Sequence, residues 1–576
     1  MTLILRSCCC IVAALFLLLG CTGSKQSTSA GSQLASTDSQ GKELFTTHCV
    51  SCHAMEREEI GPRLGGITSL LSEKELIAFI KNPNHAIESG NARAVSLSKR
   101  YKMIMPPFDF LKDDEIRSIL GYIASETRKH NIAPLEVKTD TETSNARLAQ
   151  PVVKTGLRIE LDDFVTIPPS SDKMPRTRIA NMRPHPSQDG TLYVSDQRGI
   201  IYRINGRDVT TFMDLRNQVG DFVNEPGLGT GLGSFAFHPD YLRNGLIYIT
   251  HTESFKGKPA DYAYNDSIKV ALQWVVSEWK TEDVKSPVFT GKRRELLRIN
   301  VPNVVHGTQD IGFNPEVAKG DKDYGLLYIG TGDGGSTISK YPGLCHSLHS
   351  LLGTIIRIDP LGNNSKNGHY GIPADNPYTD SKDGVYKEIY AYGFRNPHRL
   401  SWHDGKLFSA EVGESNFEEV NVIVKGGDYG WNVREGNFGI SSKDLKNVYP
   451  VPETETGKFE KPYLQYDHVD GNAISGGYVY DGPIAALKDK YIFGDIVNGR
   501  VFYANIDPKL SDQSIYELLI VRDGKESNLV EMSGSKRVDL RVEYDRFTKE
   551  LYIMTKSDGK IRRVIKAYTL TQPKGR

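Results

Sequence analysis

A short apolar strand that follows a turn recurs six times along the last two thirds of the chain. The copies are Gly190–Val194, Gly245–Ile249, Gly325–Ile329, Gly405–Phe408, Lys490–Phe493 and Glu550–Ile553. They lie about 55 to 85 residues apart, and three are followed by a strand of apolar-Arg-apolar pattern. Each blade of a β-propeller is a four-stranded unit of this general kind. The repeat therefore predicts a mostly β fold, a six-bladed β-propeller over residues 156–570. An array of β-sandwiches is the alternative, but it would not repeat this single pattern of a turn followed by a short apolar strand.

Composition limits the classes of function. The 576 residues carry 71 Lys and Arg against 71 Asp and Glu, so the formal net charge is zero. This excludes an overall basic nucleic-acid-binding protein, and we expect no nucleic-acid partner. Hydrophobic residues make up 39% and charged residues 25%, which is typical of a globular protein of more than one domain. Seven Cys are too few for a disulfide-dense scaffold.

The N-terminus has the pattern of a targeting segment. Arg6 is the only charge ahead of the apolar stretch Ile11–Leu19, and this predicts a signal peptide over residues 1–20. Leu18-Leu19-Gly20-Cys21 resembles a bacterial lipobox, so we expect a lipoprotein with Cys21 as the lipidated residue. The alternative is an ordinary signal peptide with a Cys near its cleavage site.

Residues 21–40 are rich in Ser, Thr, Gly and Gln, which predicts a flexible tether. An acylated N-terminus holds a protein on a membrane without spanning it, and no later segment is long and apolar enough to span. Thr22 follows the Cys, as in Gram-negative lipoproteins of the outer membrane. We therefore expect a protein of the periplasm or cell envelope, anchored by lipid only.

Cys49-Val50-Ser51-Cys52-His53 matches the attachment pattern of haem c. In such a motif the two thiols, here Cys49 and Cys52, form thioethers to the porphyrin, and the His, here His53, ligates the iron. A redox disulfide and a chance match are the alternatives. Only Cys345 lies farther along the chain, so no second Cys pair could complete a Cys-rich zinc site.

Residues 41–130 resemble a small class I cytochrome c, an all-α domain. The loop Ile60–Leu64 lies where that family places a Gly-Pro loop whose carbonyl accepts the proximal imidazole N–H. The resemblance makes Met105, directly before a Pro, the distal iron ligand, with Met103 as its competitor. Apolar residues at helical spacing follow it and predict a terminal helix with a core stripe: Ile116, Ile119, Leu120 and Ile123. Residues 131–155 predict a linker.

The segments Ile389–Leu400, Ser409–Glu414 and Val424–Trp431 resemble the soluble quinoprotein glucose/sorbosone dehydrogenase family. The resemblance covers roughly residues 175 to 565. That family has a six-bladed propeller that binds pyrroloquinoline quinone (PQQ) and Ca²⁺. It implies that Arg395 and Asn396 contact the quinone, with Arg395 also catalytic. It further implies that backbone carbonyls of Gly413 and Glu414 hold calcium. The alternative for Arg395 is a structural arginine that binds loop carbonyls.

The segment Val304–Phe313 implies, by the same resemblance, that His306 is the catalytic base. The alternative is a buried His bonded to backbone. Asp333 could act as a calcium ligand, but an Asx turn between glycines is favoured. A metal site could also use the nearby Cys345, His346 and His349, although three such residues in a loop are a weak signal.

Several positions depart from the family pattern. Val305 stands where an Asp precedes the base, and Gly229 replaces a Gln. The segment 494–500 lacks the Lys of the family, and Lys536 and Arg537 are the counterparts of an Arg pair at the quinone. These changes remove charge that would complement the PQQ carboxylates.

Two functions are consistent with these features. The first is a periplasmic quinohaemoprotein dehydrogenase, which oxidises a sugar or related alcohol or aldehyde through PQQ. It passes electrons to its own haem c and then to a downstream acceptor. The second is a non-catalytic binding module for a glycan or protein partner, as in Hedgehog-interacting proteins that share this domain, with a separate electron-transfer cytochrome c. Fusion to a haem domain favours the first, because a reduced quinone must lose its electrons.

Overall fold

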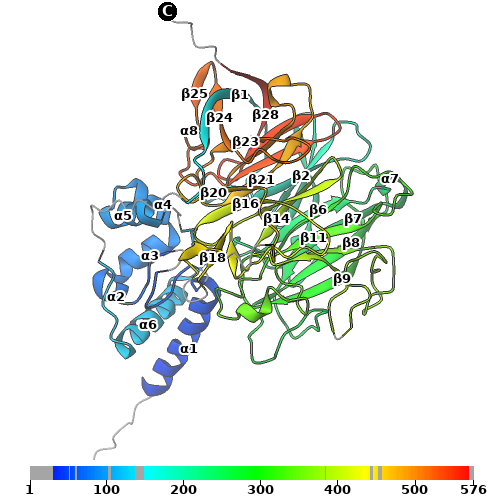
Figure 1. Ribbon diagram of the computed structural model, residues 1–576. Helices are drawn as coiled ribbons and strands as arrows, with labels where there is room; N and C mark the ends of the chain where they lie inside the picture. The colour runs from blue at the N-terminus through cyan, green and yellow to red at the C-terminus, as the bar shows by residue number, and fades with distance from the viewer. Residues whose placement is uncertain are drawn as a thin grey trace, which may run out of the picture.

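The computed structural model describes residues 30–50, 52–58, 61–101, 105–136, 148–382, 384–441, 445–451 and 457–569. As predicted, a small helical domain precedes a larger domain of β-sheets (Figure 1). The helices of the first domain are α1 (Ala30–His48), α2 (Ile67–Leu70), α3 (Glu73–Lys81), α4 (Pro83–Glu88), α5 (Ala92–Tyr101) and α6 (Asp113–Lys129). Residues 30–40, which we expected to be tether, are helical. The expected signal peptide and Cys21 lie outside the described residues.

The first and last helices of the helical domain cross closely. Gly41 of α1 lies on the backbone of α6, where an added Cβ would be 2.0 Å from the carbonyl oxygen of Ser118. The first turn of α6 is acidic, and its negative charges stabilise the helix by interacting with the positive end of the helix dipole. One face of α6 is buried, as its periodicity predicts: Ile116, Ile119, Leu120 and Ile123.

Four antiparallel four-stranded sheets make up most of the second domain. The first is β2 (Ile179–Pro184), β3 (Leu192–Asp196), β4 (Ile200–Asn205) and β5 (Asp208–Asp214). The second is β6 (Leu232–Phe237), β7 (Leu246–Glu253), β8 (Leu272–Thr281) and β9 (Gly291–Val301). The third is β10 (Thr308–Phe313), β11 (Leu327–Thr331), β12 (Thr354–Ile358) and β13 (Ile389–Tyr392). The fourth is β14 (Pro397–His403), β15 (Lys406–Glu411), β16 (Phe417–Val422) and β20 (Leu464–Asp467). A small sheet pairs β17 (Arg434–Glu435), β18 (Phe438–Ile440) and β19 (Val448–Pro450).

The remaining strands form one nine-stranded sheet. Its order is β21 (Ile474–Tyr480), β22 (Lys490–Asp495), β23 (Val501–Asn505), β24 (Tyr516–Arg522), β1 (Val153–Thr166), β28 (Lys560–Thr569), β27 (Glu550–Thr555) and β26 (Leu540–Asp545), with β25 (Lys525–Ser527) on β24. The pair β24–β1 is parallel, whereas β1–β28 is antiparallel and joins the two ends of the domain. Two groups of four strands are thus fused into one sheet, so the described sheets are not six separate units.

The first strands of the six four-strand groups contact one another in cyclic order: β2, β6, β10, β14, β21, β26 and back to β2. Polar side chains of these first strands bond to one another across the ring that the strands form. Arg183 donates to Asp310 at 2.7 Å, and Tyr478 donates to Glu543 at 2.9 Å. Each repeat found in the sequence is the second strand of its group: β3, β7, β11, β15, β22 and β27. None of the described helices is long and apolar enough to cross a membrane.

The helical domain lies against one side of the β domain, next to β18 (Figure 1). Two ion pairs connect them, Lys269–Glu43 at 2.6 Å and Lys173–Asp109 at 2.9 Å. The ammonium group of Lys446, in the β18–β19 loop, also donates to a backbone carbonyl of the helical domain. In all three contacts the cation belongs to the β domain.

Candidate active site and haem pocket

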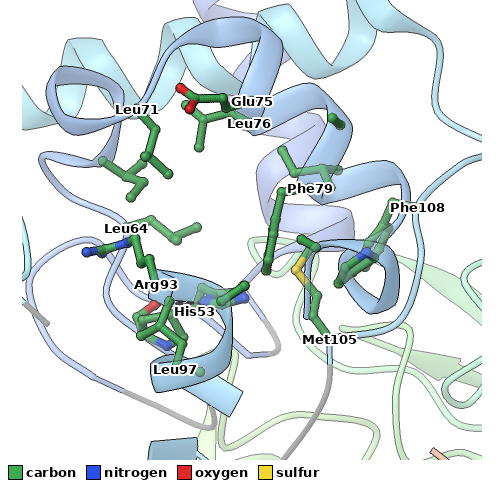
Figure 2. Close-up of a pocket in the computed structure, with 18 of the residues that line it drawn as sticks. His53, Leu64, Leu71, Glu75, Leu76, Phe79, Arg93, Leu97, Met105 and Phe108 are labelled. Carbon is green, nitrogen blue, oxygen red and sulfur yellow. Dashed lines mark hydrogen bonds between the residues drawn. The ribbon is translucent and has the colours of Figure 1, made fainter. Parts of the chain in front are cut away.

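A mainly apolar cavity of about 350 Å³ lies inside the helical domain. Its walls include Cys49, Cys52, His53, Leu64, Leu71, Leu76, Phe79, Arg93, Leu97, Met105 and Phe108. Figure 2 shows His53 and Met105 projecting into this cavity between apolar side chains. Cys49 and Cys52 are not joined in a disulfide. The four residues that the sequence assigns to haem attachment and ligation therefore lie around one cavity, and this donor set fits haem c.

The ring of His53 is held in one orientation. Its Nδ1 donates to the carbonyl oxygen of Pro62 at 2.7 Å, as the loop resemblance implies. Gly61 packs on the ring face, where an added Cβ would lie 2.5 Å from Cε1. Burial lowers the pKa of His53. This leaves Nε2 of a neutral imidazole to face the cavity. Met103, the competitor of Met105, lies outside the described residues.

A second cavity of about 220 Å³ opens between the two domains. Cys52 and Met105 line it from the helical domain, and both also line the first cavity. His306 and Arg395, predicted to be catalytic, line it from the β domain. The fold thus brings one haem-attachment cysteine and the candidate distal ligand to the cavity that the candidate active site lines.

His306 precedes β10 with a left-handed backbone, at φ 53°, which a non-glycine residue adopts at a cost in energy. Its carbonyl accepts from the N–H of Gly334 at 2.9 Å, and its side chain is 12% exposed. Nδ1 lies 2.8 Å from Oδ1 of Asp333. Burial and the charge of Arg395 lower the pKa of His306, whereas Asp333 raises it. The net lowering favours a neutral imidazole, as a general base requires.

Asp333 is fully buried and holds His306 in place. Its carboxylate accepts from the N–H of Gly335 at 2.8 Å, which is the expected Asx turn. It also accepts from Thr337 Oγ1 at 2.8 Å and from Trp431 Nε1 at 3.1 Å. The sequence analysis assigned Asp333 to the turn and missed its contact with His306, because residues so far apart in the chain give no local signal.

Arg395 is largely engaged by protein groups. Nε donates to Glu414 at 2.8 Å, and Nη1 donates to the carbonyl of Val412 at 3.0 Å. Its carbonyl in turn accepts from the N–H of Asp333 at 2.7 Å, which connects it to the histidine. A guanidinium has five N–H donors, so donors remain for a ligand. The structural role is therefore observed, and contact with a cofactor stays a prediction for this residue.

Asn396, Gly413 and Glu414 all line the cavity. Oδ1 of Asn396 is buried and has no hydrogen-bond partner within the described chain. Among the same residues, no cluster of three or more His, Cys, Asp or Glu is arranged to hold a metal. The expected calcium ligands are backbone carbonyls, which such a cluster would not include. In the Cys345, His346 and His349 loop, His346 instead bonds to Asp428 at 2.9 Å.

Alternate residues of one segment face the cavity: Ser535, Arg537, Asp539 and Arg541. Lys536 lies between two of these residues in the chain, but it is exposed and is not part of the cavity wall. Arg537 therefore lines the cavity as expected, whereas Lys536 does not. Arg541 and Lys556 also line it, and the sequence analysis missed both.

Cationic side chains outnumber carboxylates in this cavity. Five cations line it, namely Arg178, Arg395, Arg537, Arg541 and Lys556, against two carboxylates, Glu414 and Asp539. Nε of Arg541 is buried without a hydrogen-bond partner in the described chain. Excess buried positive charge and unpaired polar atoms fit a polar, anionic ligand such as PQQ.

A sequence-family model described as glucose/sorbosone dehydrogenase matches residues 181–562. The chain belongs to this family. A second model, described as cytochrome c, matches residues 39–127. This member of the glucose/sorbosone dehydrogenase family thus combines a domain of that family with a cytochrome c domain.

Its relatives include the HIPL1 protein of Arabidopsis thaliana, 26% identical over 60% of this chain and 56% of that protein. Quinoprotein glucose dehydrogenase B of Acinetobacter calcoaceticus is 26% identical over 56% of this chain and 74% of that protein. The chain therefore spans little more than half the length of HIPL1. A solved PQQ-bound aldose sugar dehydrogenase from Streptomyces coelicolor aligns with a TM-score of 0.47 and 20% identity, over 72% of this chain and 99% of that chain.

The residues that depart from the family pattern lie at the cavity or next to His306. Val305 lines the cavity beside His306, and Val497 lines it within the segment that lacks a Lys. Gly229 packs on the backbone next to His306, where an added Cβ would lie 2.8 Å from the His306 nitrogen. A larger residue at Gly229 would therefore displace the candidate base.

Proposed function

We propose that this chain is a quinohaemoprotein dehydrogenase that oxidises a sugar, or a related alcohol or aldehyde, and delivers the electrons to its own haem c. One observation carries the proposal: Met105 and Cys52 of the cytochrome line the same cavity as His306 and Arg395. A family that includes a quinoprotein glucose dehydrogenase supports the reaction class.

We also propose that the β domain is a six-bladed propeller. The cyclic contacts of the six first strands support this reading. So does the nine-stranded sheet, which divides at its parallel β24–β1 pair into two antiparallel groups of four strands. The residues that follow the second strands β15, β22 and β27 line the cavity, namely Val412, Ile496 and Lys556.

The protein residues supply acid–base chemistry and binding. His306 accepts the proton of the substrate hydroxyl at Nε2, while Asp333 fixes the tautomer through Nδ1 and stabilises the imidazolium that forms. When bound, PQQ supplies the hydride acceptor and haem c the one-electron acceptor. Arg395, Asn396 and Arg537, which line the cavity, would hold the quinone when it is bound. The carbonyls of Gly413 and Glu414 would hold Ca²⁺.

The location and the anchor belong to the same proposal. A lipidated Cys21 would place the protein in the cell envelope, on the periplasmic face of the outer membrane. Electrons would then leave the haem to a downstream acceptor in that compartment. The signal-peptide pattern and the Cys-x-x-Cys-His motif support this location.

Sugar-dependent haem reduction tests the proposed function. The full chain, reconstituted with PQQ and Ca²⁺, should reduce its haem when an aldose, alcohol or aldehyde is added, and should not do so without PQQ. His306→Ala should slow the reaction about 10²–10⁴-fold, the contribution of a general base. If no substrate reduces the haem, the non-catalytic binding module is the better account, and the similarity to HIPL1 then becomes informative.

A further inference from the structure

Lys556 carries a buried amino group that takes no part in the proposed proton transfer. It is 6% exposed and lines the cavity between the domains, one residue beyond the end of β27. Its carbonyl accepts from Thr177 Oγ1 at 3.0 Å, which fixes the backbone. Nζ donates to Oε1 of Gln197 at 2.6 Å, and in the described part of the chain no carboxylate lies within ion-pair distance of it.

The charges around Lys556 are mostly of its own sign. Arg541, Arg178 and Arg537 act on it as cations, and Asp539 is the opposing carboxylate. Asp539 is already engaged, because Nε of Arg537 donates to it at 2.9 Å. A buried charge without an ionic partner is costly, so this arrangement is unfavourable unless an anion joins it.

The protonation behaviour of the cluster agrees with this geometry. Burial, reinforced by Arg541, places the pKa of Lys556 well below its usual range. Burial and Arg399 lower the pKa of Arg541 to about 9. Both shifts have the sign expected where cations are desolvated without an anion to compensate them.

The position of Lys556 matters because another cation is missing from the same cavity. The first residue beyond β22 is Ile496, followed by Val497, and both line the cavity as apolar groups. Lys556 has the corresponding place beyond β27, the second strand of its own group. The cation absent from segment 494–500 therefore has a counterpart on the neighbouring group of strands.

We propose that Lys556 binds a carboxylate of the acidic quinone cofactor, with Arg541 as the second cation at that carboxylate. This inference rests on the proposed function, since it takes PQQ as the ligand of the cavity. An ammonium group is a point-charge donor and Arg541 offers its unpaired Nε, so together they can neutralise one carboxylate from two directions.

The test compares Lys556→Met with the wild type and with Lys525→Met, which removes an exposed lysine of β25. PQQ binding to the full chain is followed by isothermal titration calorimetry and by PQQ-induced stabilisation in thermal unfolding. Lys556→Met should raise the PQQ Kd about 10- to 100-fold, the usual loss for a hydrogen bond to a charged group. Lys525→Met should bind as the wild type does.

Thermal unfolding without PQQ separates a binding role from a structural one. If Lys556 serves a ligand, then at a pH below its lowered pKa Lys556→Met removes repulsion from the PQQ-free protein. The variant should therefore raise the unfolding temperature there, while the PQQ-induced increase shrinks. A structural lysine would show the reverse, a lower unfolding temperature without PQQ. That result, or an unchanged PQQ Kd, overturns the proposal.

A conservative variant and the pH dependence complete the test. Binding needs the protonated amine, so wild-type affinity should fall as pH rises through the lowered pKa of Lys556. Lys556→Arg should restore binding and keep it at higher pH, because guanidinium stays charged.

If the wild type binds no PQQ, the proposed function fails together with this inference. If PQQ binding is unchanged but the KM for an acidic sugar rises, the anion is the substrate and the inference alone fails.

Discussion

Met105 and His306 line one cavity, although they belong to different domains. Met105 lies on the loop before α6, and His306 lies just before β10. Lys173, Lys269 and Lys446 of the β domain contact the helical domain and hold this arrangement. A sugar oxidised beside His306 would therefore release its electrons next to the cytochrome of the same chain.

The pairing of His306 with Asp333 predicts a particular pH profile. His306 acts as a base only when neutral, so haem reduction by sugar should fall as pH drops through its folded pKa. Because that pKa is lowered, the fall should occur below the ordinary pKa of histidine. Asp333 raises this pKa, so Asp333→Asn should move the acidic limb to still lower pH. The maximal rate should drop on the order of 10²-fold, because the tautomer is no longer fixed.

Rates of sugar-dependent haem reduction from about pH 4 to 8 check this prediction. Thr337→Val is a matched control, because it removes a different hydrogen bond to Asp333 and leaves the carboxylate. An Asp333→Asn limb that moves to higher pH would contradict the assigned electrostatics.

Met105 is predicted to be the distal iron ligand. Met105→Ala should abolish the sulfur-to-iron absorption of the oxidised protein and lower its reduction potential, since a thioether favours Fe(II). Visible spectroscopy and a redox titration measure both. The assignment is wrong if Met103→Ala gives these changes and Met105→Ala does not.

Gly61 is predicted to be required for haem binding. In Gly61→Ala the new Cβ would lie 2.5 Å from the His53 ring, so the imidazole must move from Pro62. The variant should hold haem less stably, measured by haem content and thermal unfolding. Gly121→Ala, with open space around it in α6, should instead stabilise the helix by about 1 kcal/mol. Equal behaviour of the two variants would show that the contact is unimportant.

Local patterns predicted much of this protein. The strand repeat located the second strand of every four-strand group, and the Cys-x-x-Cys-His motif with its Gly-Pro loop located the His53–Pro62 contact. Each of these two signals is contained in a short stretch of sequence. The fusion of two groups through the parallel β24–β1 pair was not predictable, because it joins residues from opposite ends of the β domain.

Long-range contacts also account for the errors in the site. Asp333 looked like a turn residue because its local hydrogen bond to Gly335 is real, and its contact with His306 appears only in the fold. Lys536 and Arg537 were both counterparts of an Arg pair in the family, and only the fold shows that Arg537 lines the cavity while Lys536 is exposed. Lys556 gave no signal, since only the fold reveals that it is buried in the cavity.

The lipid anchor gives a cellular prediction. Cys21→Ser should release the protein from membranes into the soluble fraction, because the mature chain would lose its acyl groups. Fractionation with a high-salt wash, followed by immunoblotting, measures this. Membrane association of the variant that survives the wash would contradict a lipoprotein anchor.

Intramolecular electron delivery is tested most directly by anaerobic stopped-flow of the reconstituted full chain with an aldose. Haem absorption is followed at several protein concentrations, with His306→Ala as the inactive comparison. The account predicts first-order haem reduction whose rate constant does not change with protein concentration. A rate that rises in proportion to protein concentration would mean that electrons pass between molecules, and would contradict the shared cavity as the route.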